Sequence, residues 1–342
     1  MSSTSQVTTY SDIYTDIQNR VRVTTGITAT ENQAKRYANT ALQDIAFGTD
    51  YRLPWLERRA ILRTHAPYTT GTVDISVGAT TVTGTSSLWT TADSYGENNV
   101  RTTGKLTFSG ANDIYRITSV TSDTVLAITE RYIASAAADD ASYIYFEDEY
   151  ALASDFLRPV DFQMFSDDLN IRLISRRDWR MQYPRPNVSG RPRTACILDI
   201  GFSSSTTPVR RVQFYPYPDA VYSIPYTYIT SNLAVSSSGT EASAMSSDTD
   251  EPNMPLRYRH LIVLHALYNW YRDKRDDARS QEAKAEYTDA MLRLLGDREV
   301  ATHTVAQIQP RSEYYWGRAK RPYRQRGGRT IDINDQFDRM EL

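Results

Sequence analysis

The stretch Leu53-Pro54-Trp55-Leu56 separates two kinds of sequence. Before it, apolar residues recur at helical spacing, and from Ile61 onward they alternate with polar residues. Pro54 prevents a helix from continuing, because proline lacks a backbone N–H and its ring clashes with the preceding turn. The sequence therefore predicts helices on the N-terminal side of this stretch and strands on its C-terminal side.

Two helices are predicted on the N-terminal side, over residues 10–25 and 30–48. The second carries a continuous apolar stripe, and Gly48 is placed to end it. The loop between them is short, so an antiparallel pair is expected. The stripe consists of Ala34, Tyr37, Ala38, Ala41, Leu42 and Ile45.

Short alternating segments on the C-terminal side, among them Leu106–Phe108, Val125–Ile128 and Tyr143–Phe146, predict a small antiparallel sandwich or barrel over residues 68–148. The stretch 149–235 is interpreted as mixed. Within it, alternation on both sides of a Pro-Asp turn predicts a hairpin of residues 212–219 and 222–229, with Pro225 placing one strand at an edge. Residues 236–250 are rich in Ser, Thr and Gly and are expected to form a surface loop.

Helical spacing returns near Pro255 and continues to Gly296. The fold class predicted is α+β, with a helical bundle formed by both ends of the chain, an inserted antiparallel β domain and an extended C-terminal arm. The expected segments are residues 1–67 (N-terminal helices), 68–148 (inserted β-sandwich or barrel), 149–254 (mixed β-rich segment with the hairpin), 255–297 (C-terminal helices) and 298–342 (arm).

Composition indicates a globular chain with extensive protein–protein contacts. Of 342 residues 40% are hydrophobic and the net charge is −2, which is neither a disordered nor a broadly basic composition. There are 24 tyrosines against 9 phenylalanines, and tyrosine is favoured at interfaces. Cys196 is the only cysteine, so no intrachain disulfide is expected. The sequence predicts neither a signal peptide nor a membrane span.

Motifs that carry catalysis are not recognised, and no catalytic, metal-binding or cofactor-binding residue is predicted. No G-x-G-x-x-G or H-E-x-x-H pattern occurs. His260 and His265 are about 140° apart around a helix, so they do not converge on one metal. The acidic pairs and triplets at Asp139-Asp140, Glu147-Asp148-Glu149 and Asp167-Asp168 are interpreted as solvated loops and strand ends.

The C-terminal tail is the most informative functional feature. Seven basic residues lie between Arg311 and Arg329 against Glu313 alone, with aromatic residues interleaved. Such a tail could bind nucleic acid by phosphate neutralisation and stacking, or lie in an acidic protein groove, or have no function. The protein groove is favoured, because the rest of the chain is not basic.

The order of motifs resembles the head-to-tail adaptor, or connector, proteins of tailed bacteriophages, including the tail tubular A proteins of short-tailed phages. The resemblance covers most of residues 30–296. It departs from the smaller adaptors at the β insertion of residues 68–148 and in the long tail. The motifs that carry it are Ala38-Asn-Thr-Ala-Leu-Gln-Asp-Ile45, Leu53-Pro-Trp-Leu-Glu57, the T-V-T-G-T-S-S-L-W run within residues 70–91, Glu149-Tyr-Ala-Leu-Ala-Ser-Asp-Phe156, Phe214-Tyr-Pro-Tyr-Pro-Asp219 and Met254-Pro-Leu-Arg-Tyr-Arg-His260.

The resemblance implies a virion structural protein that forms a ring, commonly a dodecamer, beneath the portal protein. It implies that the ring connects the capsid to a tail or nozzle protein, lets viral DNA pass through its lumen without sequence-specific binding, and assembles in the bacterial cytoplasm. The expected portal-binding residues are Tyr314, Tyr315, Trp316, Arg318, Lys320, Arg321, Tyr323, Arg324 and Arg326. The expected bundle or subunit interface comprises Tyr37, Leu42, Leu264, Tyr268, Trp270 and Tyr271.

Two other classes of function stay open. The β region and its acidic loops could belong to a tail-associated protein that binds or degrades glycans. The basic tail could belong to a DNA-binding packaging accessory, whose affinity would fall steeply with salt.

Overall fold

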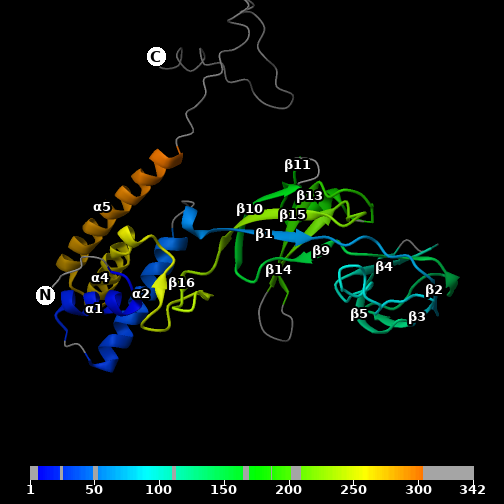
Figure 1. The fold of residues 1–342 in the computed structure, drawn as a ribbon, viewed down its shortest axis with the longest axis horizontal. Coiled ribbons are helices and arrows are strands. Elements are labelled where there is room, and N and C mark those ends of the chain that lie inside the picture. Colours follow the sequence, from blue (N-terminus) through cyan, green and yellow to red (C-terminus); the bar gives the residue numbers. More distant parts are fainter. Residues whose placement is uncertain are drawn as a thin grey trace, which may run out of the picture. The chain divides into compact units, whose positions relative to one another are not determined.

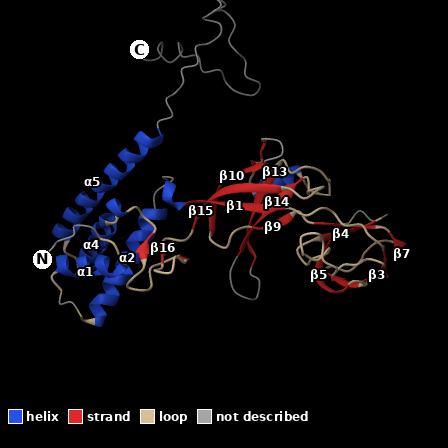
Figure 2. Ribbon diagram, in the orientation of Figure 1, coloured by secondary structure: helices blue, strands red, loops and turns tan. Residues whose placement is uncertain are grey.

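The computed structural model describes residues 7–23, 26–48, 53–109, 113–164, 169–185, 187–201 and 209–302. Strands outnumber helices in this part of the chain, with eighteen strands and five α-helices (Figure 2). The chain divides into two compact units, residues 1–284 and 285–342. All the strands lie in the first unit, and helix α5 (Asp277–Thr302) runs from the first unit into the second.

Three helices of the first unit pack against one another: α1 (Tyr10–Val21), α2 (Thr28–Phe47) and α4 (His260–Asp273) (Figure 1). Helix α1 begins at a capping box, in which Thr9 accepts from the N–H of Asp12 and the Asp12 carboxylate accepts from the N–H of Thr9. Ile13 and Ile17, one turn apart on α1, are fully buried. These three helices are called the helical unit below.

A seven-stranded antiparallel sheet follows, in the order β7-β2-β3-β6-β5-β4-β8. Its core contains the fully buried Trp89, whose indole N–H donates to the Tyr143 hydroxyl at 2.8 Å. This seven-stranded unit comprises β2 (Thr72–Ile75), β3 (Thr81–Thr85), β4 (Lys105–Phe108), β5 (Tyr115–Ser122), β6 (Val125–Ile128), β7 (Ala138–Ala141) and β8 (Tyr143–Phe146).

Two further sheets share one hydrophobic core and are called the two-sheet unit. Phe162 stacks on Tyr226 in this core, with ring centroids 5.1 Å apart, and Phe214 packs edge-on against Phe162. One sheet has the order β1-β15-β10-β11, with β1 (Glu57–Arg63), β10 (Phe156–Met164), β11 (Leu169–Asn170) and β15 (Ser223–Thr230). The other has the order β12-β13-β14-β9, with β9 (Glu149–Ala151), β12 (Arg172–Leu173), β13 (Thr194–Gly201) and β14 (Val209–Tyr215).

A small sheet connects the strands to the helical unit. Its order is β17-β16-β18, with β16 (Ala234–Val235), β17 (Glu241–Ala242) and β18 (Glu251–Pro252). The Tyr10 N–H donates to the Asp250 carbonyl at 2.8 Å, and the Asn39 amide donates to the Met245 carbonyl at 3.0 Å. The remaining short elements are α3 (Arg176–Gln182) and the 3-10 turns Pro54–Leu56 and Leu256–Tyr258.

The predicted fold class is wrong: the chain is not a helical bundle with a small inserted β domain, but a mainly β structure with helices at one part of it. The error arises in residues 149–235, whose sequence was interpreted as a mixture of helix and strand. Register shifts in β10 and the prolines Pro159 and Pro225 interrupt the alternation that marks a strand, yet tertiary packing makes these residues part of a β core.

The predicted hairpin is also wrong, because its two strands belong to different sheets. Strand β14 pairs with β13 and β9, whereas β15 pairs with β1 and β10. Strand β15, which contains Pro225, lies between β1 and β10, so it is not the edge strand that was predicted. The connection from β14 to β15 spans residues 216–222. It carries Tyr217 onto the ring of Phe146, with ring centroids 4.2 Å apart.

Candidate functional site

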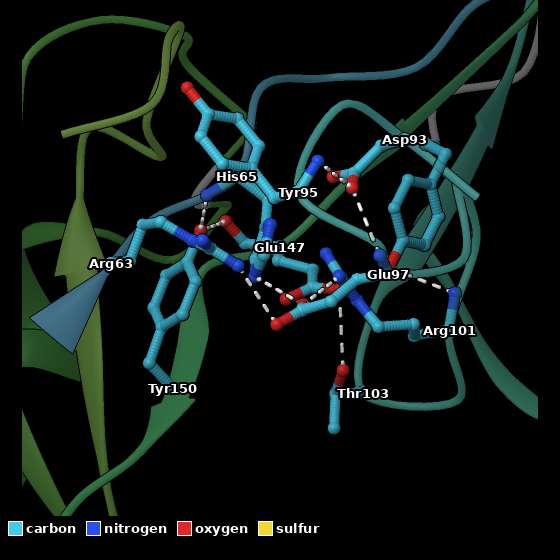
Figure 3. A network of polar contacts seen from close by, with 10 residues as sticks. Arg63, His65, Asp93, Tyr95, Glu97, Arg101, Thr103, Glu147 and Tyr150 are labelled. Atoms are coloured by element: carbon cyan, nitrogen blue, oxygen red, sulfur yellow. Dashed lines mark hydrogen bonds and ion pairs between the residues drawn. The ribbon is translucent and has the colours of Figure 1, made fainter.

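Charged side chains gather where the chain passes between the two-sheet unit and the seven-stranded unit. The chain makes this passage twice, after β1 and again between β8 and β9. Tyr68 and Tyr145 exchange two backbone hydrogen bonds of 2.9 Å and hold the two passages together. The set of polar contacts around them is called the junction below, and Figure 3 shows its first part, around Glu97.

The first part of the junction is built around Glu97. Arg63 at the end of β1 reaches its carboxylate at 2.9 Å, and His65 reaches it at 3.3 Å. Arg101 contacts Glu97 with one guanidinium nitrogen and Glu147 with its Nε, at 2.7 Å (Figure 3). One arginine thereby joins two carboxylates, one from each side of the junction.

The loop that presents Glu97 is shaped by its own hydrogen bonds. The Asp93 carboxylate accepts from the backbone N–H of Tyr95 at 2.8 Å and from that of Glu97 at 3.0 Å. The same loop brings the Tyr95 ring under the Arg63 guanidinium, 4.4 Å from the ring centroid. Burial is the largest single influence on the pKa of Asp93 and acts upward, but the two hydrogen bonds and the nearby Arg101 and His65 together lower this pKa.

The second part of the junction is a buried ion cluster centred on Lys105. Its ammonium group lies 2.7 Å from Asp148 and 2.9 Å from Glu149, and the residue as a whole is only 6% exposed. Arg116 reaches Glu149 at 3.1 Å, and the amide of Gln213 donates to Asp148 at 2.6 Å. Strand β4 and strand β14 are thus joined through one carboxylate.

The pKa values of the two carboxyl groups in this cluster are shifted in opposite directions. Complete burial raises the pKa of Asp148, although Lys105 acts against the rise. Burial also acts upward on Glu149, but Lys105 and Arg116 together hold the pKa of this carboxyl below its usual value. Asp148 Oδ1 has no hydrogen-bond partner among the described residues. The ion pair with Lys105 therefore offsets the desolvation cost of the buried Asp148 carboxylate.

His65 joins Tyr150 to the first part of the junction. Its ring stacks on Tyr150, and its backbone N–H donates to the Tyr150 hydroxyl at 3.2 Å. That hydroxyl in turn donates to the Glu147 carbonyl at 3.0 Å. Burial, followed by the positive charge of Arg101, lowers the pKa of His65 below 6.5, so the ring is neutral at pH 7.

The sequence was interpreted as placing the acidic triplet Glu147-Asp148-Glu149 in solvent. The structure shows that this interpretation is wrong. All three side chains are buried and form the junction. A signal was present in the sequence, because an unbroken acidic run between the strand residues Tyr143–Phe146 and a further apolar stretch needs cations from elsewhere. The cations come from Arg101, Lys105 and Arg116, which no local pattern connects to it.

The expected interface residues on α2 and α4 divide into two groups. Four of them, Tyr37, Leu42, Leu264 and Trp270, are buried inside the chain. The Tyr37 hydroxyl contacts the Asp273 carboxylate and its ring packs against Trp270. Tyr268 and Tyr271 are only half-buried, and the Tyr271 hydroxyl donates to the Arg20 carbonyl at 3.4 Å. The expected portal-binding residues between Tyr314 and Arg326 lie outside the described residues.

Two kinds of feature are absent from the described part of the chain. No three His, Cys, Asp or Glu side chains there are arranged to hold a metal ion. None of the helices described is both long and apolar enough to cross a membrane. The polar groups of the junction pair with one another and join the two-sheet unit to the seven-stranded unit.

The sequence of the chain matches a known protein family. The SU10 adaptor protein family matches residues 134–311, which is more than half of the chain. The chain therefore belongs to the SU10 adaptor protein family, and is a structural adaptor protein of the bacteriophage virion. Its partners are accordingly other components of the phage capsid and tail. No curated protein matches the sequence.

Proposed function

We propose that this adaptor forms a homo-oligomeric ring, a dodecamer, beneath the portal protein and connects the capsid to the tail. The observation that carries the proposal is the match to the adaptor family, which includes helix α4 and every strand of the two-sheet unit except β1. Viral DNA passes through the lumen of such a ring during packaging and genome ejection. The assembly takes place in the bacterial cytoplasm, and the mature location is the neck of the virion.

Ring closure needs two different faces on each subunit that fit one another. Tyr268 and Tyr271 of α4 are proposed to belong to one such face, because they retain exposure while Tyr37 and Trp270 are used inside the helical unit. Half-exposed tyrosines combine a stiff apolar ring with a polar tip and suit a subunit contact.

The basic and aromatic residues between Tyr314 and Arg326 are proposed to bind the portal protein. Arginine pairs with carboxylates through two parallel hydrogen bonds, and aromatic rings fill pockets, so an acidic groove on the portal is the expected receptor. The seven-stranded unit is proposed to face tail or nozzle components.

The proposal is tested with the portal protein of the same virus. Full-length chain, a chain ending at Arg329 and a chain ending at Pro310 are each mixed with the portal. Co-purification and the mass of the complex are then measured by size-exclusion chromatography with light scattering. We expect about a dozen copies to bind the portal with the first two chains and none with the third.

Two results would contradict this assignment. Undiminished portal binding by the chain ending at Pro310 would show that the arm is not the receptor-binding part. A cryo-EM map of the virion neck with these sheets outside the portal-proximal ring would overturn the whole placement.

A further inference from the structure

Strand β1 is the open edge of its sheet. It pairs with β15 on one side, and no strand of the described chain pairs with its other side. The Thr64 N–H donates to the Tyr222 carbonyl at 2.9 Å, one position beyond the pair Arg63 and Ser223. Hydrogen-bonded positions alternate along an antiparallel pair, so Leu62 and Ala60 bond to β15. The backbone groups of Arg59, Ile61 and Arg63 therefore point to the open edge.

A second contact gives the same alternation independently. The Thr227 N–H donates to the Asp161 carboxylate of β10 at 3.0 Å, so Thr227 points away from β1. Its opposite residue Arg59 must then direct its N–H and C=O away from β15. No described residue makes a backbone hydrogen bond to the outward groups of Arg59 or Ile61.

The side chains along this edge select the chemistry of a partner strand. Ile61 is 67% exposed and shares its face of the sheet with Arg59, whereas Leu62 points into the buried core. An open, seven-residue edge is a template for another strand, and positive charges along it disfavour pairing with a basic segment. The matching partner is an extended segment in which acidic and apolar residues alternate.

The chain itself contains such a segment, in residues 330–335 with the sequence Thr-Ile-Asp-Ile-Asn-Asp. Ile331 and Ile333 would lie on one face of a strand and Asp332 on the other. Residues 330–342 carry four acidic residues against Arg339 alone. Among the stretches outside the described residues, only this one alternates in that way.

We propose that residues 330–335 of a neighbouring copy add to β1 as a further strand. Ile331 and Ile333 then extend the apolar face that contains Leu62, and Asp332 lies directly opposite Ile61 on the other face, next to Arg59. The residues between Thr302 and Thr330 can span up to about 90 Å when extended. The choice of a neighbouring copy rests on the ring proposed above. In that ring the added strand joins each subunit to the next by main-chain hydrogen bonds.

The first test pairs cysteines across the proposed contact. A chain with Ile61→Cys and a chain with Asp332→Cys are co-expressed, mildly oxidised and separated on a non-reducing gel. The native Cys196 is fully buried and does not compete. We expect a disulfide-linked pair of chains, and no such pair when Val77→Cys, which is 53% exposed on the loop after β2, replaces Ile61→Cys.

The second test measures amide exchange in β1 of the assembled protein. Ending the chain at Arg329 should speed exchange of the outward amides of Arg59 and Ile61 about tenfold, because open strand edges exchange freely. The variant Arg59→Glu should have the same effect, and adding Asp332→Arg should reverse it.

Absence of the interchain disulfide, or amide exchange in β1 unchanged by truncation, would each overturn the proposal. The chain ending at Arg329 keeps the basic arm, so portal binding reports on the adaptor function separately. Lost portal binding with an intact cysteine pair would sink that function and leave the strand addition standing.

Discussion

Lys105 is the residue on which the buried part of the junction depends. It neutralises both Asp148 and Glu149, and Asp148 has no exposure to water. A buried ion pair adds little net stability over an apolar pair, but removing one partner leaves an unpaired charge in the interior. The effect of a substitution here is therefore asymmetric.

We expect Lys105→Met to lower the free energy of unfolding by about 3–5 kcal/mol. The measurement is urea denaturation followed by tryptophan fluorescence, with Lys274→Met on the exposed end of α4 as the control. Adding Asp148→Asn to Lys105→Met should recover part of the loss, because the unpaired charge is then absent. Equal effects of Lys105→Met and Lys274→Met would contradict the described cluster.

His65 makes the junction sensitive to mild acid. Its folded pKa lies below 6.5, so the unfolded chain binds the proton more readily. The stability that the neutral ring contributes is present above pH 6.5 and is lost as the pH falls through the folded pKa. Arg63, Arg101, Glu97 and Glu147 face this ring and set the size of the effect.

The expected result is a thermal midpoint that falls less between pH 7 and pH 5 in His65→Gln than in the original chain. Calorimetry at several pH values in one buffer series measures it. The matched control is His260→Gln, because His260 is exposed at the start of α4. A pH dependence that His260→Gln removes and His65→Gln does not would reverse the assignment.

Among the elements, β4 is preceded by a residue, Gly104, that close packing restricts to glycine. A Cβ at Gly104 would lie 2.1 Å from the Tyr145 ring, which is itself buried against the Arg101 backbone. The ring has no room to move, because its hydroxyl is held by Glu147. The requirement for glycine comes from close packing and not from backbone conformation.

Replacing Gly104 with alanine is therefore expected to destabilise the protein by about 1–3 kcal/mol, through overpacking. Proteolysis of the seven-stranded unit should speed up accordingly while the helical unit stays resistant. Thr103→Ala, whose hydroxyl is 3.3 Å from Glu147, is the neighbouring control and should cost less.

Local sequence patterns could predict the elements better than their partners. The strands expected at Leu106–Phe108, Val125–Ile128 and Tyr143–Phe146 are present, because a period of two needs no knowledge of neighbours. The separation of β14 from β15 could not be predicted, because it depends on where Tyr217 docks. For the same reason the burial of Glu147, Asp148 and Glu149 could not be predicted from their own acidic run.

At the scale of the whole molecule, the predicted helical bundle failed because the order of elements along the chain does not fix which group dominates the fold. The helices α1, α2 and α4 do pack together, but the sheets hold their own cores. The extent of a β core depends on contacts distant in sequence, such as Phe162 with Phe214 and Tyr226, and composition does not reveal these.

The paired backbones of Tyr68 and Tyr145 lead to a prediction for the whole chain. A short Gly-Ser turn in place of residues 69–144, together with Asp148→Asn and Glu149→Gln, should leave the two-sheet unit folded. Circular dichroism and portal binding would measure this. The same replacement without the two neutralising substitutions should unfold at lower temperature, because the acidic side chains lose their cations.

Strands that enter and leave at one point behave as an exchangeable cassette. A lineage can acquire, enlarge or discard such a module by one recombination event, provided that the acidic triplet changes in step with it. The junction would then record that history: relatives without the cassette should carry neutral residues at the positions of Asp148 and Glu149. Diversification of the seven-stranded unit then proceeds without disturbing the two-sheet unit or the helical unit.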